Sequence, residues 1–173
     1  LYRYTLEKAG IFVTYVYKAI SINPVLLLPW IGTLIIIGYI VGLMVKHEPM
    51  ISGSGIPQVE GVLLRKLHMN WWKVIIGKFF GGVLTIGSGL SLGREGPSVQ
   101  LGAAVGQGFS KVFKRIKIEE KYLMTSGASA GLAAAFNAPL AGAMFALEEV
   151  HKNFSPLIFL SALSAALSAD FVT

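Results

Sequence analysis

The feature that most restricts the fold is a glycine-rich break, residues 87–100, between two largely apolar runs. Within the break and the apolar run after it, residues 101–109, only Arg94 and Glu95 are charged. A charged pair between segments apolar enough to lie in a bilayer is expensive to insert, and by default it indicates a functional site.

Glycine and proline predict the local geometry of this break. Gly93 and Gly96 permit unusual dihedrals and close approach of the backbone to a ligand, and Pro97 suits the first turn of a helix. We therefore expect a helix ending near Leu92, a bent loop carrying Glu95, and a new helix starting at Pro97. The free N–H groups and positive dipole end of that helix would form an anion site at membrane depth.

Composition supports a membrane setting. The chain is 54% hydrophobic and 14% charged, with a mean hydropathy of +0.65. Residues 24–45 and 122–147 form uncharged runs of 22 and 26 residues, against the roughly 20 needed to span a bilayer. We expect an all-α, multi-pass integral membrane protein, in a plasma (inner) membrane.

Charge and cysteine content narrow the function classes. The net charge of +6 fits basic loops facing anionic headgroups, and we expect no nucleic-acid partner. The absence of cysteine excludes disulfides and thiolate metal sites. No hydrolase or dehydrogenase constellation is present, so we expect neither an enzyme nor a metal site.

A second break has the same construction as the first. In Gly53-Ser54-Gly55-Ile56-Pro57, glycines surround one small polar residue and a proline follows at the start of a helix. That helix, from Ile56 to about Leu67, is too short to span. We expect the Ser54 hydroxyl and the Gly55 and Ile56 amides at its open end to bind an anion. A single such motif also fits a solvent-exposed turn, but two interruptions in one apolar chain favour a transport site.

Two charged residues next to this break are predicted to pair. Glu60 lies on the short helix and Lys78 lies inside the helix that follows Trp71-Trp72. Because either charge alone is unfavourable at membrane depth, we expect a buried Glu60–Lys78 ion pair. The alternative is that both side chains reach the headgroups.

A third break follows a helix of small residues. Residues 122–136 are typical of a helix that packs closely against others, and Asn137-Ala-Pro139 ends it. A short helix over residues 139–150 would follow, carrying Glu148-Glu149 near its end. A last helix, from Ser155-Pro156 to about Ala169, suits packing against another subunit.

Taken in order, three motifs resemble the CLC family of chloride channels and proton-coupled chloride transporters. They are Gly53-Ser-Gly-Ile-Pro57, Gly93-Arg-Glu-Gly-Pro97, and Phe136-Asn-Ala-Pro-Leu-Ala-Gly142 leading to Glu148-Glu149. The resemblance implies a bundle of spanning, tilted and broken half-helices. It also implies that residues 1–173 are a single transmembrane region, the first of two inverted-topology repeats, truncated at both ends. The missing C-terminal half and a second copy, contacting through the last helices, are the implied partners.

The resemblance also implies roles for individual residues. Ser54, with Gly55 and Ile56, would coordinate chloride from the intracellular side, and Gly96 and Pro97 would open the second anion-facing helix. Glu95 would be the gating glutamate and Glu149 the inner proton-transfer glutamate. Apart from the resemblance, the expected membrane depth of Arg94, Glu60 and Lys78 predicts that they act as supporting charges. Chloride would be the substrate, with no cofactor.

Three functional alternatives remain open at this point. A chloride/proton antiporter is favoured because both Glu95 and Glu149 are present. A passive, voltage-gated-type chloride channel would need Glu95 but not Glu149. A transport-incompetent half-domain would fit the absence of the second repeat. Fluoride and nitrate also remain open as substrates.

Overall fold

The computed structural model describes residues 2–172 as helices joined by turns, with no strand in that range. The all-α prediction is confirmed. The helices are α1 (Tyr2–Ile22), α2 (Leu27–His47), α3 (Ile56–Leu63), α4 (Trp71–Gly87), α5 (Glu95–Val112), α6 (Lys117–Phe136), α7 (Pro139–Phe145) and α8 (Pro156–Val172), with 3₁₀ turns at Pro24–Leu26 and Pro49–Ile51 and a π-helical segment at Ala146–His151.

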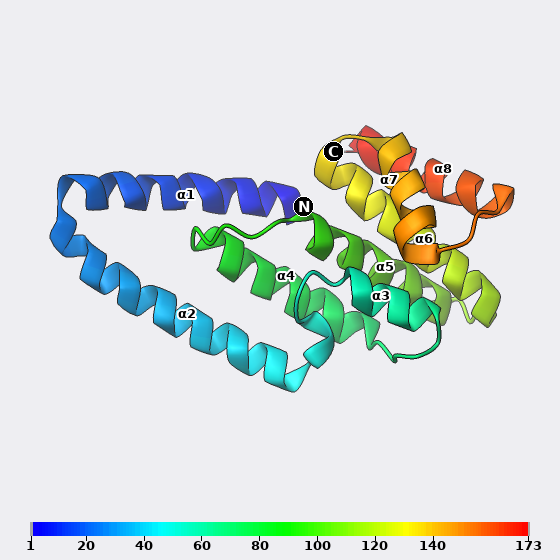
Figure 1. Cartoon of the computed structure of the whole chain (residues 1–173), viewed down its shortest axis with the longest axis horizontal. Coiled ribbons are helices and arrows are strands. Elements are labelled where there is room, and N and C mark those ends of the chain that lie inside the picture. Colours follow the sequence, from blue (N-terminus) through cyan, green and yellow to red (C-terminus); the bar gives the residue numbers. More distant parts are fainter. Residues whose placement is uncertain (1, 173) are drawn as a thin grey trace.

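Helices α1 and α2 form a long hairpin that extends from one side of the molecule (Figure 1). α1 contacts α4, and none of the side chains of α2 is buried. The segment Pro24–His47 has 24 residues and a mean hydropathy of 2.2, so it is long and apolar enough to cross a membrane. An apolar helix with no buried residue is the form expected where lipid or further protein surrounds it.

The centre of the remaining bundle is the contact between α5 and α6, whose backbones touch at glycines. A Cβ atom on Gly102 would lie 2.8 Å from the carbonyl carbon of Gly127, and one on Gly106 would lie 2.7 Å from that of Leu123. Small residues permit this approach. The other side of α6 packs on α8, where the Ser129 hydroxyl donates to the Ala162 carbonyl at 3.0 Å. The small-residue helix is therefore enclosed by its neighbours, as predicted.

One apolar cluster fixes the short helix α3 against this centre. It draws buried side chains from α3, α4, α5, α6 and the π-helical segment, including Val59, Val74, Val99, Ala103, Met124, Ala128 and Val150. Because α3 contributes to the same core as α5, the N-terminus of α3 is held in a fixed position relative to that of α5.

Two boundaries at the central break differ from the prediction. α4 ends at Gly87 rather than near Leu92, and Gly89, at φ +87°, turns the chain directly afterwards. α5 begins at Glu95 rather than Pro97. Proline needs only a place in the first turn, where its missing N–H is not used, so the helix extends two residues before it. Glu95 consequently lies in the first helical turn and not in the loop.

The close α5–α6 contact leads to a stability prediction. Gly102→Ala places a methyl group against the Gly127 backbone, which cannot move aside as a flexible side chain would. We expect a loss of about 1–3 kcal/mol in unfolding free energy, measured as a lower melting temperature in detergent. Gly38→Ala on α2 is the control, because a Cβ there meets nothing within 4 Å. Equal melting temperatures for the two variants would contradict this account of the core.

Candidate anion site

The two glycine-rich breaks lie in direct contact. A Cβ on Gly96 would lie 2.5 Å from the carbonyl oxygen of Ser54, so the first turn of α5 touches the loop before α3. Gly55, at φ +96°, packs equally closely on Gln100 of α5, where an added Cβ would lie 2.7 Å from the glutamine Cβ. These contacts bring together two helix N-termini, whose first N–H groups have no partner inside the helix.

Both N-termini open onto one cavity of about 660 Å³. Of the residues predicted to bind the anion, Ser54, Ile56, Gly96 and Pro97 line it. Gly55 is buried behind them. The cavity therefore combines a hydroxyl group with the positive ends of two helix dipoles, a combination suited to an anion.

Two charged side chains, Glu95 and Lys78, also line this cavity. Glu95 is half-buried in the first turn of α5. The Glu95 carboxylate folds back against Gly93. A side chain at position 93 would occupy the space that this carboxylate takes. A negative group in the first turn is stabilised by the helix dipole, and it occupies the region where a bound anion would also be favoured.

Lys78 holds the loop that carries Ser54. Its ammonium group donates to the carbonyls of Ile51 at 3.0 Å and Gly53 at 2.7 Å, and only 5% of the residue is exposed. Ile51 ends the 3₁₀ turn and Gly53 lies in the loop between that turn and α3. The lysine therefore satisfies two backbone acceptors while fixing the turn.

The predicted Glu60–Lys78 ion pair is wrong. Glu60 pairs instead with Lys152, at 2.6 Å. The physical reason is the placement of α3, which packs mainly against the π-helical segment and α5, so the Glu60 carboxylate lies within reach of Lys152 in the turn after that segment. The nearby turn carbonyls replace the carboxylate as partners of Lys78.

The Glu60–Lys152 pair lies next to Glu149. Lys152 follows the π-helical segment, and the hydrogen bond that it donates to the Glu60 carboxylate raises its pKa, with a smaller contribution from the charge of Glu149. Glu149 itself is exposed and does not line the cavity that contains Glu95. The structure thus brings Glu95 to the anion cavity and leaves Glu149 on a separate surface.

Arg94 also lies apart from Glu95, its neighbour in sequence. It lines a different cavity, of about 200 Å³, together with Tyr2 and Arg3 of α1. Arg3 in turn donates to the side chain of Asn137, the residue that ends α6. Arg94 is therefore part of the contact region between α1 and the bundle, and it does not line the anion cavity.

Sequence reasoning missed two residues that shape the site. Gln100 is fully buried and donates to the Met50 carbonyl at 2.7 Å, which ties α5 to the turn before α3. Its signal in the sequence was a long amide side chain directly before a run of small and apolar residues, 101–106. Lys152 carried no comparable signal, because its partner Glu60 is distant in sequence.

Broken helices whose N-termini converge on one cavity, in a chain with an apolar segment of spanning length, are an arrangement found at the anion sites of membrane transporters. The chain belongs to the voltage gated chloride channel family, whose sequence profile matches residues 33–173. The resemblance inferred from the three motifs is thereby confirmed.

Individual relatives agree with this assignment. The chain is 46% identical over 145 residues to the H(+)/Cl(-) exchange transporter ClcA of Vibrio campbellii, covering 82% of this chain and 30% of the relative. It is 41% identical over 158 residues to ClcA of Cronobacter sakazakii, covering 86% and 33%. The crystal structure of a slow cyanobacterial Cl⁻/H⁺ antiporter superposes with a TM-score of 0.84 at 35% identity, covering 99% of this chain and 41% of that one. This chain thus spans about a third of the length of the curated relatives.

The position of Lys78 leads to a prediction about the site. Lys78→Met keeps an unbranched side chain, one atom shorter, but leaves the Ile51 and Gly53 carbonyls without their charged donor. Hydrogen bonds to charged groups contribute about 1.5–3 kcal/mol, so we expect a stability loss of that order and weaker chloride binding, measured by thermal unfolding and calorimetric titration of the complete protein. The control is Lys73→Met, an exposed lysine on the same helix. A Lys78→Met protein that binds chloride as tightly as the control would contradict the role assigned to this lysine.

Proposed function

We propose that the protein containing this chain exchanges chloride for protons across a membrane, with the cavity between α3 and α5 as its chloride site. The observation that carries the proposal is the position of Glu95, which lines the same cavity as Ser54 and the two helix N-termini. A titratable carboxylate and an anion are then attracted to the same positive groups.

Competition at this cavity links the two ions. The ionised Glu95 carboxylate and chloride repel each other, and both are stabilised by the N-termini of α3 and α5. Protonation removes the charge of Glu95 and favours chloride entry, while chloride binding favours the protonated carboxylate. This reciprocity is the minimum required for coupled transport, because each ligand changes the affinity for the other by the same factor.

Glu149 is proposed to exchange protons with water at the inner surface. It is exposed on the π-helical segment, next to the Glu60–Lys152 pair. A passive channel would need the gating carboxylate but no second titratable group. The presence of Glu149, together with relatives named as exchangers, favours exchange. Since Glu149 lies outside the Glu95 cavity, protons would travel between them through water or through side chains of the rest of the protein.

The remaining proposals concern the membrane around the protein, the second half of the fold and the oligomeric state. We propose that the protein is a multi-pass component of a plasma (inner) membrane and that a second inverted repeat completes the cavity. We further propose a homodimer that contacts through α8, which exposes Leu157, Leu160 and Leu167.

The role of Glu95 is tested by Glu95→Gln in the complete protein reconstituted into liposomes. Glutamine keeps the shape and removes the titration, so we expect chloride efflux to persist while proton movement against a gradient disappears. Chloride efflux and external pH are recorded on the same vesicles. Continued proton pumping by this variant would contradict the assignment.

The role of Glu149 is tested by a matched pair of variants. Glu149→Gln should retain chloride flux and lose proton coupling, because the inner proton donor is gone. Glu148→Gln removes the same charge from the adjacent exposed position and should remain coupled. The ratio of chloride to proton flux distinguishes them, and equal ratios would show that both residues act only as surface charge.

A further inference from the structure

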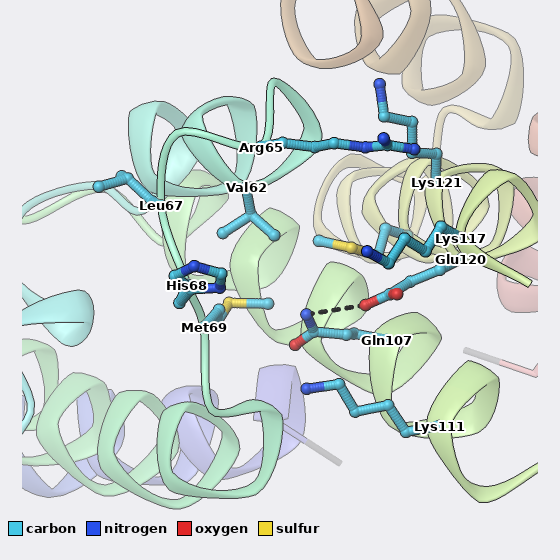
Figure 2. Close-up of a pocket in the computed structure, with 11 residues that line it drawn as sticks. Val62, Arg65, Leu67, His68, Met69, Gln107, Lys111, Lys117, Glu120 and Lys121 are labelled. Atoms are coloured by element: carbon cyan, nitrogen blue, oxygen red, sulfur yellow. Dashed lines mark hydrogen bonds between the residues drawn. The ribbon is translucent and has the colours of Figure 1, made fainter. Parts of the chain in front are cut away.

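A third cavity, of about 260 Å³, lies at the end of the bundle where α3 and α5 end and α4 and α6 begin. Figure 2 shows side chains from the α3–α4 connection, from α5 and from α6 around it. It shares no lining residue with the anion cavity. The proposed chloride site therefore does not explain why these residues lie together.

The cavity carries a large excess of positive charge. Arg65, Lys111, Lys117 and Lys121 line it, and Glu120 is the single carboxylate among its lining residues. Glu120 accepts a hydrogen bond from the Gln107 amide at 3.0 Å. Across residues 2–172, none of the four cations takes part in a salt bridge. Four unpaired cations around one opening repel one another unless an anion lies between them.

The backbone directs these charges toward the same space. Arg65 adopts a left-handed conformation, at φ +59°, in the turn after α3, and its side chain extends toward Lys121 (Figure 2). Lys117 begins α6, so the positive end of that helix dipole lies at the cavity as well. A left-handed arginine is an unfavourable conformation for an L-residue. Here it places a guanidinium group opposite lysines from another helix.

The floor of the cavity and its size limit what it would bind. Met69 and Met124 are buried and line the cavity together with the cations. The side-chain amide oxygen of Gln107 is also buried, and it has no hydrogen-bond partner. The volume is below the roughly 300–1,000 Å³ of sites for whole small molecules, so it suits one compact anionic group. Halide offers a single charge with no directional acceptors. A phosphate group offers up to two charges and three acceptor oxygens, which match several separate donors.

We propose that this cavity, lined by Arg65, Lys111, Lys117 and Lys121, binds a phosphate group, either free or carried on a lipid headgroup. The proposal is independent of chloride/proton exchange. The guanidinium and ammonium groups would donate hydrogen bonds to the phosphate oxygens. A protonated oxygen of the ligand would donate to the side-chain amide oxygen of Gln107, which has no other partner.

The test uses the complete protein in detergent with saturating chloride, which keeps phosphate out of the transport cavity. Inorganic phosphate is titrated by calorimetry, and native mass spectrometry counts bound dioleoyl phosphatidic acid against dioleoyl phosphatidylcholine. Arg65→Gln/Lys121→Gln should weaken binding at least about tenfold, since two charged donors are lost. Lys66→Gln/Lys114→Gln is the control. It removes the same charge from exposed neighbouring positions that do not line the cavity.

The outcomes separate the two sources of phosphate. Binding of inorganic phosphate that only the Arg65/Lys121 variant weakens supports a free phosphate ligand, and the same pattern for phosphatidic acid alone supports a lipid headgroup. No binding of either probe, or equal weakening in both double variants, would overturn the proposal. Glu120→Gln provides an opposite test, because it removes the repelling charge and keeps an acceptor for Gln107. It should tighten binding, and unchanged or weaker binding would place the anion elsewhere.

Discussion

The anion site depends on one contact, between Gly96 at the start of α5 and the Ser54 backbone before α3. Any side chain at position 96 would separate the first turn of α5 from the loop before α3 and move the helix N-termini apart. Their positive ends act together only because the backbones touch, since the field of a helix end falls off within about one turn. The glycine contacts between α5 and α6 hold α5 in place, and Lys78 and Gln100 hold the turn before α3.

Cations are used in two different ways in this molecule. Lys78 is satisfied by two backbone carbonyls, so its positive charge lines the candidate anion cavity without requiring a carboxylate partner that would repel an anion. The cations at the other end of the bundle have no such internal acceptors. Lys78 is buried and needs partners to offset its desolvation, whereas Arg65, Lys111 and Lys117 are exposed and Lys121 is half-buried. We therefore treat the first lysine as part of the scaffold and the second group as a binding site.

Much of the chain path was predictable from local chemistry, and much of the side-chain pairing was not. Glycine and proline act on their own backbone, so the breaks near Ser54, Glu95 and Asn137 were visible in the sequence. Which face of a helix meets which neighbour depends on tertiary packing, and for this reason Glu60 was assigned to Lys78 although it binds Lys152. Arg94 and Glu95 are adjacent in sequence, yet they line different cavities. A pattern of charges identified the site region without giving the direction of each side chain.

The ion pair between Glu60 and Lys152 has a mechanical consequence. α3 has eight residues and is about 12 Å long at 1.5 Å per residue, too short to bend appreciably. The N-terminus of this short helix follows Ser54. Glu60, in its middle, pairs with Lys152 in the turn after the π-helical segment. π-helical turns are uncommon, and proteins often place them at functional sites. A shift of the π-helical segment would rotate α3 as one body. The Ser54 loop would then move without any change of conformation within α3.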